Sequence, residues 1–107
     1  MSRYLFIARY ASDGVKGVAA AGGSARRSVI QKLAEGLGGR METFDFAFGE
    51  DDVYTILELP TNTMAAAVAL AVNSTGQASV RTVALLTPEE IDDAAKQTVR
   101  YTPPGAS

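Results

Sequence analysis

The stretch RMETFDFAFGEDDVYTILELP, residues 40–60, decides the fold. Its first part alternates phenylalanine with smaller or polar residues, which is the period-two pattern of a β-strand. Its second part, from Val53, is rich in β-branched and aliphatic residues and stops at Pro60. The polar, glycine-containing break between the two parts is typical of a turn. The stretch therefore predicts a β-hairpin with strands over 40–48 and 53–59.

Upstream of the hairpin, the sequence predicts one strand and one main helix. An unbroken aromatic and aliphatic run predicts a strand over 3–10. Asp13 is a candidate N-cap for a short helical piece over 14–21, after which two glycines interrupt the pattern. Apolar residues at helical spacing then predict an amphipathic helix over 25–37, and the glycine pair that follows is typical of a left-handed C-cap.

Downstream of the hairpin, the order of helix, glycine and strand returns. An alanine-rich segment capped near Thr61 predicts a helix through Asn73, and a strand follows over 78–86. Thr87 and Glu90 then form the pattern of a capping box around a proline. This pattern predicts a last helix that ends at about residue 98.

Together these elements predict an α+β domain of ferredoxin-like βαββαβ type with an additional C-terminal helix. Right-handed crossovers favour a four-stranded antiparallel sheet in the order 4-1-3-2 with the helices on one face. A length of 107 residues is enough for one hydrophobic core, so we expect a single domain over 1–100. Residues 101–107, which contain two prolines and a glycine, are expected to form a loose tail.

The two faces of the expected sheet differ in charge. If the hairpin turn consists of Glu50 and Asp51, then Phe48 lies opposite Val53, and the face that holds these two residues carries no charge. We assign that face to the core beneath the helices. The opposite face holds six apolar and four charged residues: Leu5, Ile7, Tyr54, Ile56, Val83 and Leu85, with Arg9, Asp45, Glu58 and Arg81.

The apolar residues of this opposite face predict self-association. Keeping them in water would forgo about 10 kcal/mol, at roughly 1.5–3 kcal/mol per buried side chain, which is comparable with the whole stability of a domain. A second sheet packed on the face would recover that burial. We therefore expect a homodimer formed sheet to sheet, and a higher oligomer stays open as an extension of it.

The composition excludes several kinds of chemistry and of partner. The chain has no Cys and no His, so it lacks a thiolate nucleophile, a histidine base and the usual protein ligands of zinc and haem. We expect no metal and no cofactor. Ten basic and twelve acidic residues give a net charge of −2 without a basic cluster, so we expect no nucleic-acid partner. Because the N-terminal run does not resemble a signal peptide and no apolar run is long enough to cross a membrane, we expect a cytoplasmic protein without a membrane partner.

Five segments of the chain carry a further signal: RYLFIARY at 3–10, KLAEGLGGRMETF at 32–44, FAFGEDDVYTILELP at 46–60, AAAVALAVNSTG at 65–76 and VRTVALLTPEE at 80–90. Together they resemble the GYD domain family over about residues 3–95. The resemblance implies a small prokaryotic protein of the dimeric α/β-barrel group, in which ferredoxin-like domains pair through their sheets. It implies no particular biochemical function.

The residues after which the family is named lie at the hairpin. We align Gly49, Asp51 and Asp52 with the family's Gly, Tyr and Asp, so that Asp51 stands in place of the tyrosine. A role that depends on a phenol at that position is therefore not expected here. We expect Glu50, Asp51 and Asp52 to be solvated, since no second group of ligands for a divalent cation lies nearby in the sequence.

One group of candidate site residues follows from the antiparallel pairing. The first, third and fourth strands meet at one end of the expected sheet, which brings Arg9, Tyr54 and Arg81 together. Two guanidinium groups beside a phenol suit a carboxylate or another small anion, with Asp45 or Glu58 as orienting groups. The alternative is that the arginines pair with Asp45 or Glu58 across the dimer, because buried charges are normally paired.

Arg26 and Arg27 form a second candidate site. They lie near the start of an expected helix, where the helix dipole disfavours cations, and this indicates a nearby anion. Asp13 or solvent is the alternative source of compensation. The surrounding spacing matches no standard phosphate loop.

These observations favour a homo-oligomeric binding protein over an enzyme. Its cavity, at the dimer seam or between the sheet and the helices, would take a small apolar or weakly acidic molecule. One alternative is a cofactor-independent enzyme, similar to the monooxygenases and isomerases of the same barrel group, which rests on fold analogy alone. A structural subunit without a ligand is the other. A titratable group beside an open cavity would favour catalysis.

Overall fold

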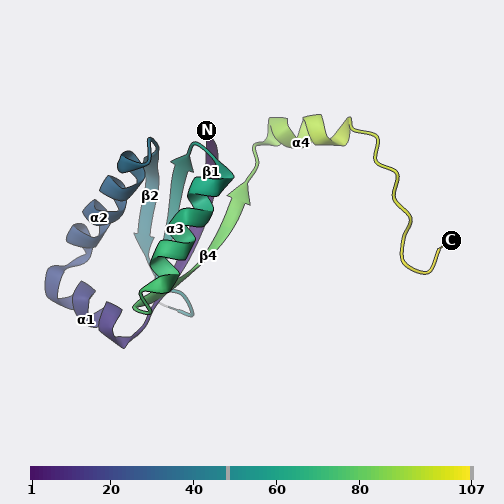
Figure 1. Ribbon diagram of the computed structural model, residues 1–107. Coiled ribbons are helices and arrows are strands. Elements are labelled where there is room, and N and C mark those ends of the chain that lie inside the picture. The colour runs from purple at the N-terminus through teal and green to yellow at the C-terminus, as the bar shows by residue number, and fades with distance from the viewer. Residues whose placement is uncertain (48, 107) are drawn as a thin grey trace.

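The alternating and helical patterns of the sequence produce a mixed α+β fold, which the computed structural model describes for residues 1–47 and 49–106 (Figure 1). The strands are β1 (Ser2–Tyr10), β2 (Arg40–Phe46), β3 (Val53–Leu59) and β4 (Ala78–Leu85). The helices are α1 (Ser12–Ala21), α2 (Gly23–Gly36), α3 (Asn62–Ser74) and α4 (Pro88–Ala95). The predicted order of elements is therefore present, with α4 ending at Ala95 rather than near residue 98.

The strands form one antiparallel sheet in the order β2-β3-β1-β4. Read from the opposite edge, this is the same arrangement as the expected order 4-1-3-2. The helices α2 and α3 lie side by side on one face of the sheet, and the short α1 connects the end of β1 to α2 (Figure 1). The other face of the sheet has no helix on it in this view, and we call it the open face.

Side-chain capping explains where α3 and α4 begin. The Thr61 side chain accepts a hydrogen bond from the Met64 N–H at 3.2 Å, and Thr87 and Glu90 form the predicted capping box at the start of α4. The predicted N-cap at Asp13 is wrong, because α1 begins at Ser12, two residues before the predicted start, and Ala11 is its N-cap. Asp13 instead lies in the first turn of α1, where its negative charge suits the helix dipole.

The predicted register of the hairpin is also wrong, by two residues. Phe46, not Phe48, lies opposite Val53, and Phe44 lies opposite Thr55. Phe48 itself lies outside the residues that the structure describes. The faces of Phe44 and Phe46 stay as expected, because a shift of two residues preserves the side of the sheet to which a side chain points.

The longer loop of the hairpin has a physical cause in contacts with β1. The Asp52 N–H donates to the Ala8 carbonyl and the Asp52 carboxylate accepts from the Tyr10 N–H, both at 2.8 Å. The Ala47 N–H donates to the Asp52 carbonyl at 2.8 Å and closes the loop. Asp52 is thus bound to the neighbouring strand and Ala47 to Asp52, so the hairpin does not turn tightly over Glu50 and Asp51.

The core lies between the sheet and the two long helices. Its buried residues come from β1, β3, α2 and α3: Tyr4, Phe6, Ala34, Leu57, Leu59, Ala65 and Val68. Alanines on the helices allow close approach to the sheet. Gly39 allows another, since a Cβ at that position would lie 2.0 Å from the Glu58 carbonyl oxygen.

The edge strand β4 contributes less to the core than its alternation predicts. Thr82 and Ala84 share the face that the helices cover, yet both are exposed. Leu86, which we expected on the same face, lies just beyond β4 and is 60% exposed. An edge strand has a neighbouring strand on one side only, so its side chains receive less cover.

Beyond β4 the chain leaves the body of the domain. In Figure 1, α4 and the residues after it project from the β4 edge, and Ile91 of α4 is 51% exposed. Among the described residues, no helix has the length and apolar character that crossing a membrane requires.

Candidate functional site

The structure brings the predicted arginines of the open face together at one end of the sheet. Arg81 lies across β1 from Tyr54, with Ile7 between them, and Arg9 lies two residues further along β1. A shallow cavity of about 380 Å³ runs between Arg9 and Arg81. Sequence reasoning therefore brought Arg9 and Arg81 together correctly, whereas Tyr54 does not line this cavity.

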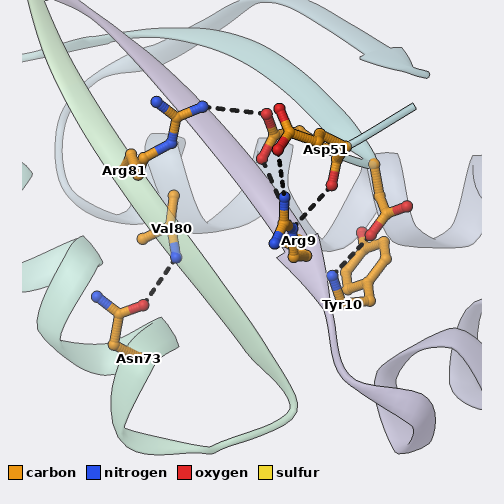
Figure 2. A network of polar contacts seen from close by, with 8 residues as sticks. Arg9, Tyr10, Asp51, Asn73, Val80 and Arg81 are labelled. Atoms are coloured by element: carbon orange, nitrogen blue, oxygen red, sulfur yellow. Dashed lines mark hydrogen bonds and ion pairs between the residues drawn. The ribbon is translucent and has the colours of Figure 1, made fainter. Parts of the chain in front are cut away.

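The partner of these arginines is Asp51, which the sequence did not indicate. Arg81 Nη2 donates to Asp51 Oδ2 at 3.0 Å, and Arg9 Nε lies 4.0 Å from Asp51 Oδ1 (Figure 2). Arg9 Nε also donates to the Glu50 carbonyl at 2.7 Å. The Asp51 side chain is only 11% exposed, so the hairpin loop places one well-shielded carboxylate between two guanidinium groups. The charge that would attract a small anion is largely balanced from within the chain.

The two predicted orienting groups do not take part in this cluster. Glu58 forms a hydrogen-bonded ion pair with Arg40, and Asp45 lies opposite Tyr54 at the β2 edge. Within residues 1–47 and 49–106, Asp45 forms no ion pair. The prediction that Asp45 or Glu58 orients a ligand beside Arg9 and Arg81 therefore gains no contact in a single chain.

The hairpin residues aligned with the family name hold the loop in place. Asp52 binds the backbone of β1, as described above, and Asp51 binds the arginines. Gly49 is exposed, and a Cβ added there would meet nothing within 4 Å. In the described part of the chain, no three acidic side chains come together in a way that could hold a metal ion.

A second charged cluster lies at the opposite end of the open face. Arg3 donates to Glu42 through two hydrogen bonds, of 2.8 and 3.0 Å, next to the Arg40–Glu58 pair. The hydrogen bond from Arg3 lowers the pKa of Glu42, and the same contact raises the pKa of Arg3. The pairing register between β2 and β3 shifts between Met41 and Thr43, next to Glu42. No local pattern in the sequence predicted this irregularity.

The helical side of the sheet contains a larger cleft, which lies among α1, the start of α2, the end of α3 and the end of β1. Its volume is about 440 Å³. Valine and leucine side chains from the helices wall it: Val18, Val29, Leu33 and Val72. Its polar lining residues include Tyr10, Asp13, Arg26, Thr75 and Gln77. The sequence left open a cavity between the sheet and the helices, but no local pattern predicted which residues line it.

Arg26 occupies the inner end of this cleft. Its guanidinium carbon lies 5.9 Å from the centre of the Tyr10 ring, and its Nε is buried without a hydrogen-bond partner. Arg26 also lines a smaller cavity of about 40 Å³ that continues inward, toward the core residues Phe6 and Leu57. The cleft and the smaller cavity share Tyr10, Arg26, Leu33 and Val72 as lining residues.

The two arginines of the second candidate site separate in the structure. Arg27 is exposed and does not line any of the cavities described here, whereas Arg26 is half-buried and lines two of them. Asp13 lies on the same cleft, but it forms no ion pair with Arg26 in the described part of the chain. The predicted compensation of Arg26 by Asp13 is therefore not present.

Fold and cleft together define a ferredoxin-like α+β domain with one bare sheet face and a ligand-sized cleft beneath its helices. The particular family follows from sequence comparison. The chain belongs to the GYD domain family, whose sequence profile matches residues 4–95 of 107. Neither a search of curated proteins nor a search of solved structures found a significant match.

Proposed function

We propose that this GYD domain protein is a homodimer that binds a small apolar or weakly acidic molecule. The observation that carries the binding function is the cleft of about 440 Å³ among the three helices and the end of β1. This volume lies within the range of about 300–1,000 Å³ that is typical of small-molecule sites. The lining is mostly apolar and includes a few polar groups, which is also the usual composition of such sites.

Between the two locations that the sequence left open, the geometry favours the cleft over the dimer seam. At the seam, Asp51 balances Arg9 and Arg81, so an incoming anion would have to displace a carboxylate of the chain itself. In the cleft, Arg26 offers an unpaired cation beside apolar walls. A ligand there would displace no carboxylate of the chain from Arg26.

The open face supports the proposed homodimer. Its apolar middle consists of Leu5, Ile7, Tyr54, Ile56, Val83 and Leu85. Tyr54 and Val83 are 39% and 43% exposed, while Ile7 is 9% exposed, so neighbouring side chains already shield part of this surface. The gain from covering it is therefore smaller than the sequence alone suggested. Each end of the face carries both signs of charge, which suits pairing of the face with a second copy around a two-fold axis.

Native mass spectrometry of freshly purified protein tests both parts of the proposal. We expect the mass of a dimer at micromolar concentration, together with a retained small molecule. A protein that stays monomeric would overturn the homodimer. A clean dimer that carries no adduct, and that takes up none when offered apolar acids, would overturn the binding function and favour a structural subunit.

A matched pair of substitutions tests the interface. Val83→Asp places a charge in the middle of the open face, where it is unfavourable against a second apolar sheet, and we expect dissociation to monomers. Leu70→Asp is the control, because Leu70 is 72% exposed on α3, on the other side of the sheet. Light scattering during gel filtration should give a monomer for Val83→Asp and a dimer for Leu70→Asp. A dimer in both variants would contradict the proposed interface.

A further inference from the structure

We infer that the ligand of the cleft is a monocarboxylate with an apolar body, and that Arg26 binds its carboxylate. This inference rests on the proposed function, because it concerns the same cleft, and it adds the chemical class of the ligand and the residue that recognises it.

The first observation is that Arg26 lacks a partner that other arginines of the domain possess. Arg3, Arg9, Arg40 and Arg81 each form an ion pair with a carboxylate. Arg26 forms none within the described residues, and its Nε is buried without an acceptor. A buried donor without a partner loses the hydrogen bonds that water would provide. An acceptor supplied by a ligand would restore them.

The second observation is that an aromatic ring helps to hold the guanidinium group of Arg26 in position. The Tyr10 ring lies 5.9 Å from its central carbon, a distance at which an aromatic ring attracts a cation. Tyr10 itself is fixed, because its backbone N–H donates to the Asp52 carboxylate at 2.8 Å (Figure 2). A positioned guanidinium loses less conformational entropy on binding and can engage both oxygens of a carboxylate.

The third observation concerns the charge that the cleft can accept. One guanidinium group is present, and the carboxylate of Asp13 lines the same cleft. A dianion such as a phosphate monoester would meet one cation and one anion there. A monoanion suits this balance better, and a carboxylate also matches the planar geometry of the arginine.

The fourth observation concerns the rest of the ligand. Apart from the polar residues named above, the lining is apolar, and its largest aliphatic side chains come from three helices: Val18, Val29, Leu33 and Val72. These residues offer no directional hydrogen bonds to a sugar or a peptide. They suit an aliphatic or aromatic body, which gains free energy when it leaves water.

Calorimetric titration of the full chain with octanoate and with 1-octanol tests the inference. The two probes share the apolar chain and differ in charge. We expect octanoate to bind more tightly, and we expect Arg26→Gln to weaken octanoate binding about tenfold to hundredfold while leaving 1-octanol binding unchanged. Arg27→Gln is the matched control, since it removes the same charge from the next residue, which is exposed and outside the cleft.

The outcomes separate the inference from the proposed function. If both probes bind equally and Arg26→Gln changes neither, the cleft binds ligands but the carboxylate assignment is wrong. Equal weakening by Arg26→Gln and Arg27→Gln would also overturn the assignment, because it would show only general attraction to positive charge. If neither probe binds the unmodified protein, both the inference and the proposed function are overturned.

A conservative variant guards against loss of folding in Arg26→Gln. Arg26→Lys keeps the positive charge but removes the two-pronged geometry, so octanoate should bind several-fold more weakly than to the unmodified protein. Circular dichroism of each variant shows whether the fold is intact. Unchanged octanoate affinity in a folded Arg26→Lys variant would contradict binding through both nitrogens of the guanidinium.

Discussion

The arginines of the open face and Arg26 beneath the helices are placed differently with respect to negative charge. On the open face, the hairpin loop brings Asp51 between Arg9 and Arg81, at 4.0 and 3.0 Å. On the helical face, Arg26 lies over Tyr10 at the end of an apolar cleft and has no carboxylate partner in the described part of the chain. The first arrangement is complete within one chain, whereas the second is complete only when something else supplies an acceptor.

This difference shows that residue type alone does not identify a ligand site. Both regions offer guanidinium groups to an anion, and the sequence suggested the open face as the sharper candidate. What separates the two regions is the local supply of carboxylates. In this chain, Asp51 of the hairpin loop provides the balancing charge.

The largest expected effect comes from moving α1, which forms one wall of the cleft. A Cβ at Gly14 would lie 2.3 Å from the Gln77 carbonyl oxygen, which also accepts a hydrogen bond from the Ala11 N–H at 2.8 Å. Gly14→Ala should therefore push the helix away and lower the free energy of unfolding by about 2 kcal/mol, as overpacking does. Urea unfolding measures this loss, and octanoate affinity should fall with it.

Gly17 provides the matched control on the same helix. A Cβ there meets nothing within 4 Å, so Gly17→Ala should gain helix propensity and raise the free energy of unfolding by about 0.5–1 kcal/mol. Both changes lie on the helical side of the sheet, whereas the arginine cluster lies on the open face, so dimerisation should be the same in both variants. Equal effects of the two substitutions on stability would contradict the close approach of α1 to Gln77.

The same comparison shows which features local sequence patterns can predict. The strands and the caps at Thr61 and Thr87 follow from residues within a few positions of one another, and the order of the sheet then follows from the order of elements and the handedness of their connections. The hairpin register depends on Asp52 binding the backbone of β1, a contact about forty residues away in sequence, and alternation cannot report it.

The candidate sites divide in the same way. The helix dipole indicated that Arg26 and Arg27 need compensation, but only the packing of α2 on the sheet shows which of the two lines the cleft. The cleft itself depends on how closely α1 approaches the turn before β4, a long-range contact that the glycines of α1 permit without specifying. The sequence therefore proposed the residue but not its surroundings.

The next effect in size concerns the free energy of unfolding, which should change in opposite directions when an arginine is replaced on the open face and in the cleft. Arg81→Met leaves Asp51 with a single, longer contact to Arg9, and should lower the free energy of unfolding by up to about 1 kcal/mol, the usual limit for exposed pairs. Arg26→Met keeps an apolar stem, removes an unpaired cation from the first turns of α2, and should raise the free energy of unfolding by about 0.5–1 kcal/mol. Urea unfolding of ligand-free protein at one protein concentration measures both values.

An unpaired charged group that is kept for a ligand lowers the stability of the unmodified protein. A variant without this group should therefore be more stable and bind carboxylates less well. The contrast would fail if Arg26→Met destabilised the protein as much as Arg81→Met does. In that case Arg26 would be paired in solution, and the comparison between complete and incomplete charge clusters would not hold.

The smallest expected effect lies in the second charged cluster of the open face, and its signature is a dependence on pH. The hydrogen bond from Arg3 holds the pKa of Glu42 below its ordinary value of 4.5. A carboxyl group whose pKa is lower in the folded state contributes stability above its unfolded pKa and loses that contribution as the pH falls through its folded pKa. Glu42→Gln should therefore lower the melting temperature slightly near neutral pH, and the difference from the unmodified protein should shrink as the pH falls below 4.5.

Glu35→Gln, at an exposed position of α2, is the control and should show no such trend. If the difference in melting temperature for Glu42→Gln stays constant across this pH range, the substitution acts through packing rather than charge. The Arg3–Glu42 pair would then contribute no charge-dependent stability, in contrast to the pairs of Asp51 at the other end of the open face.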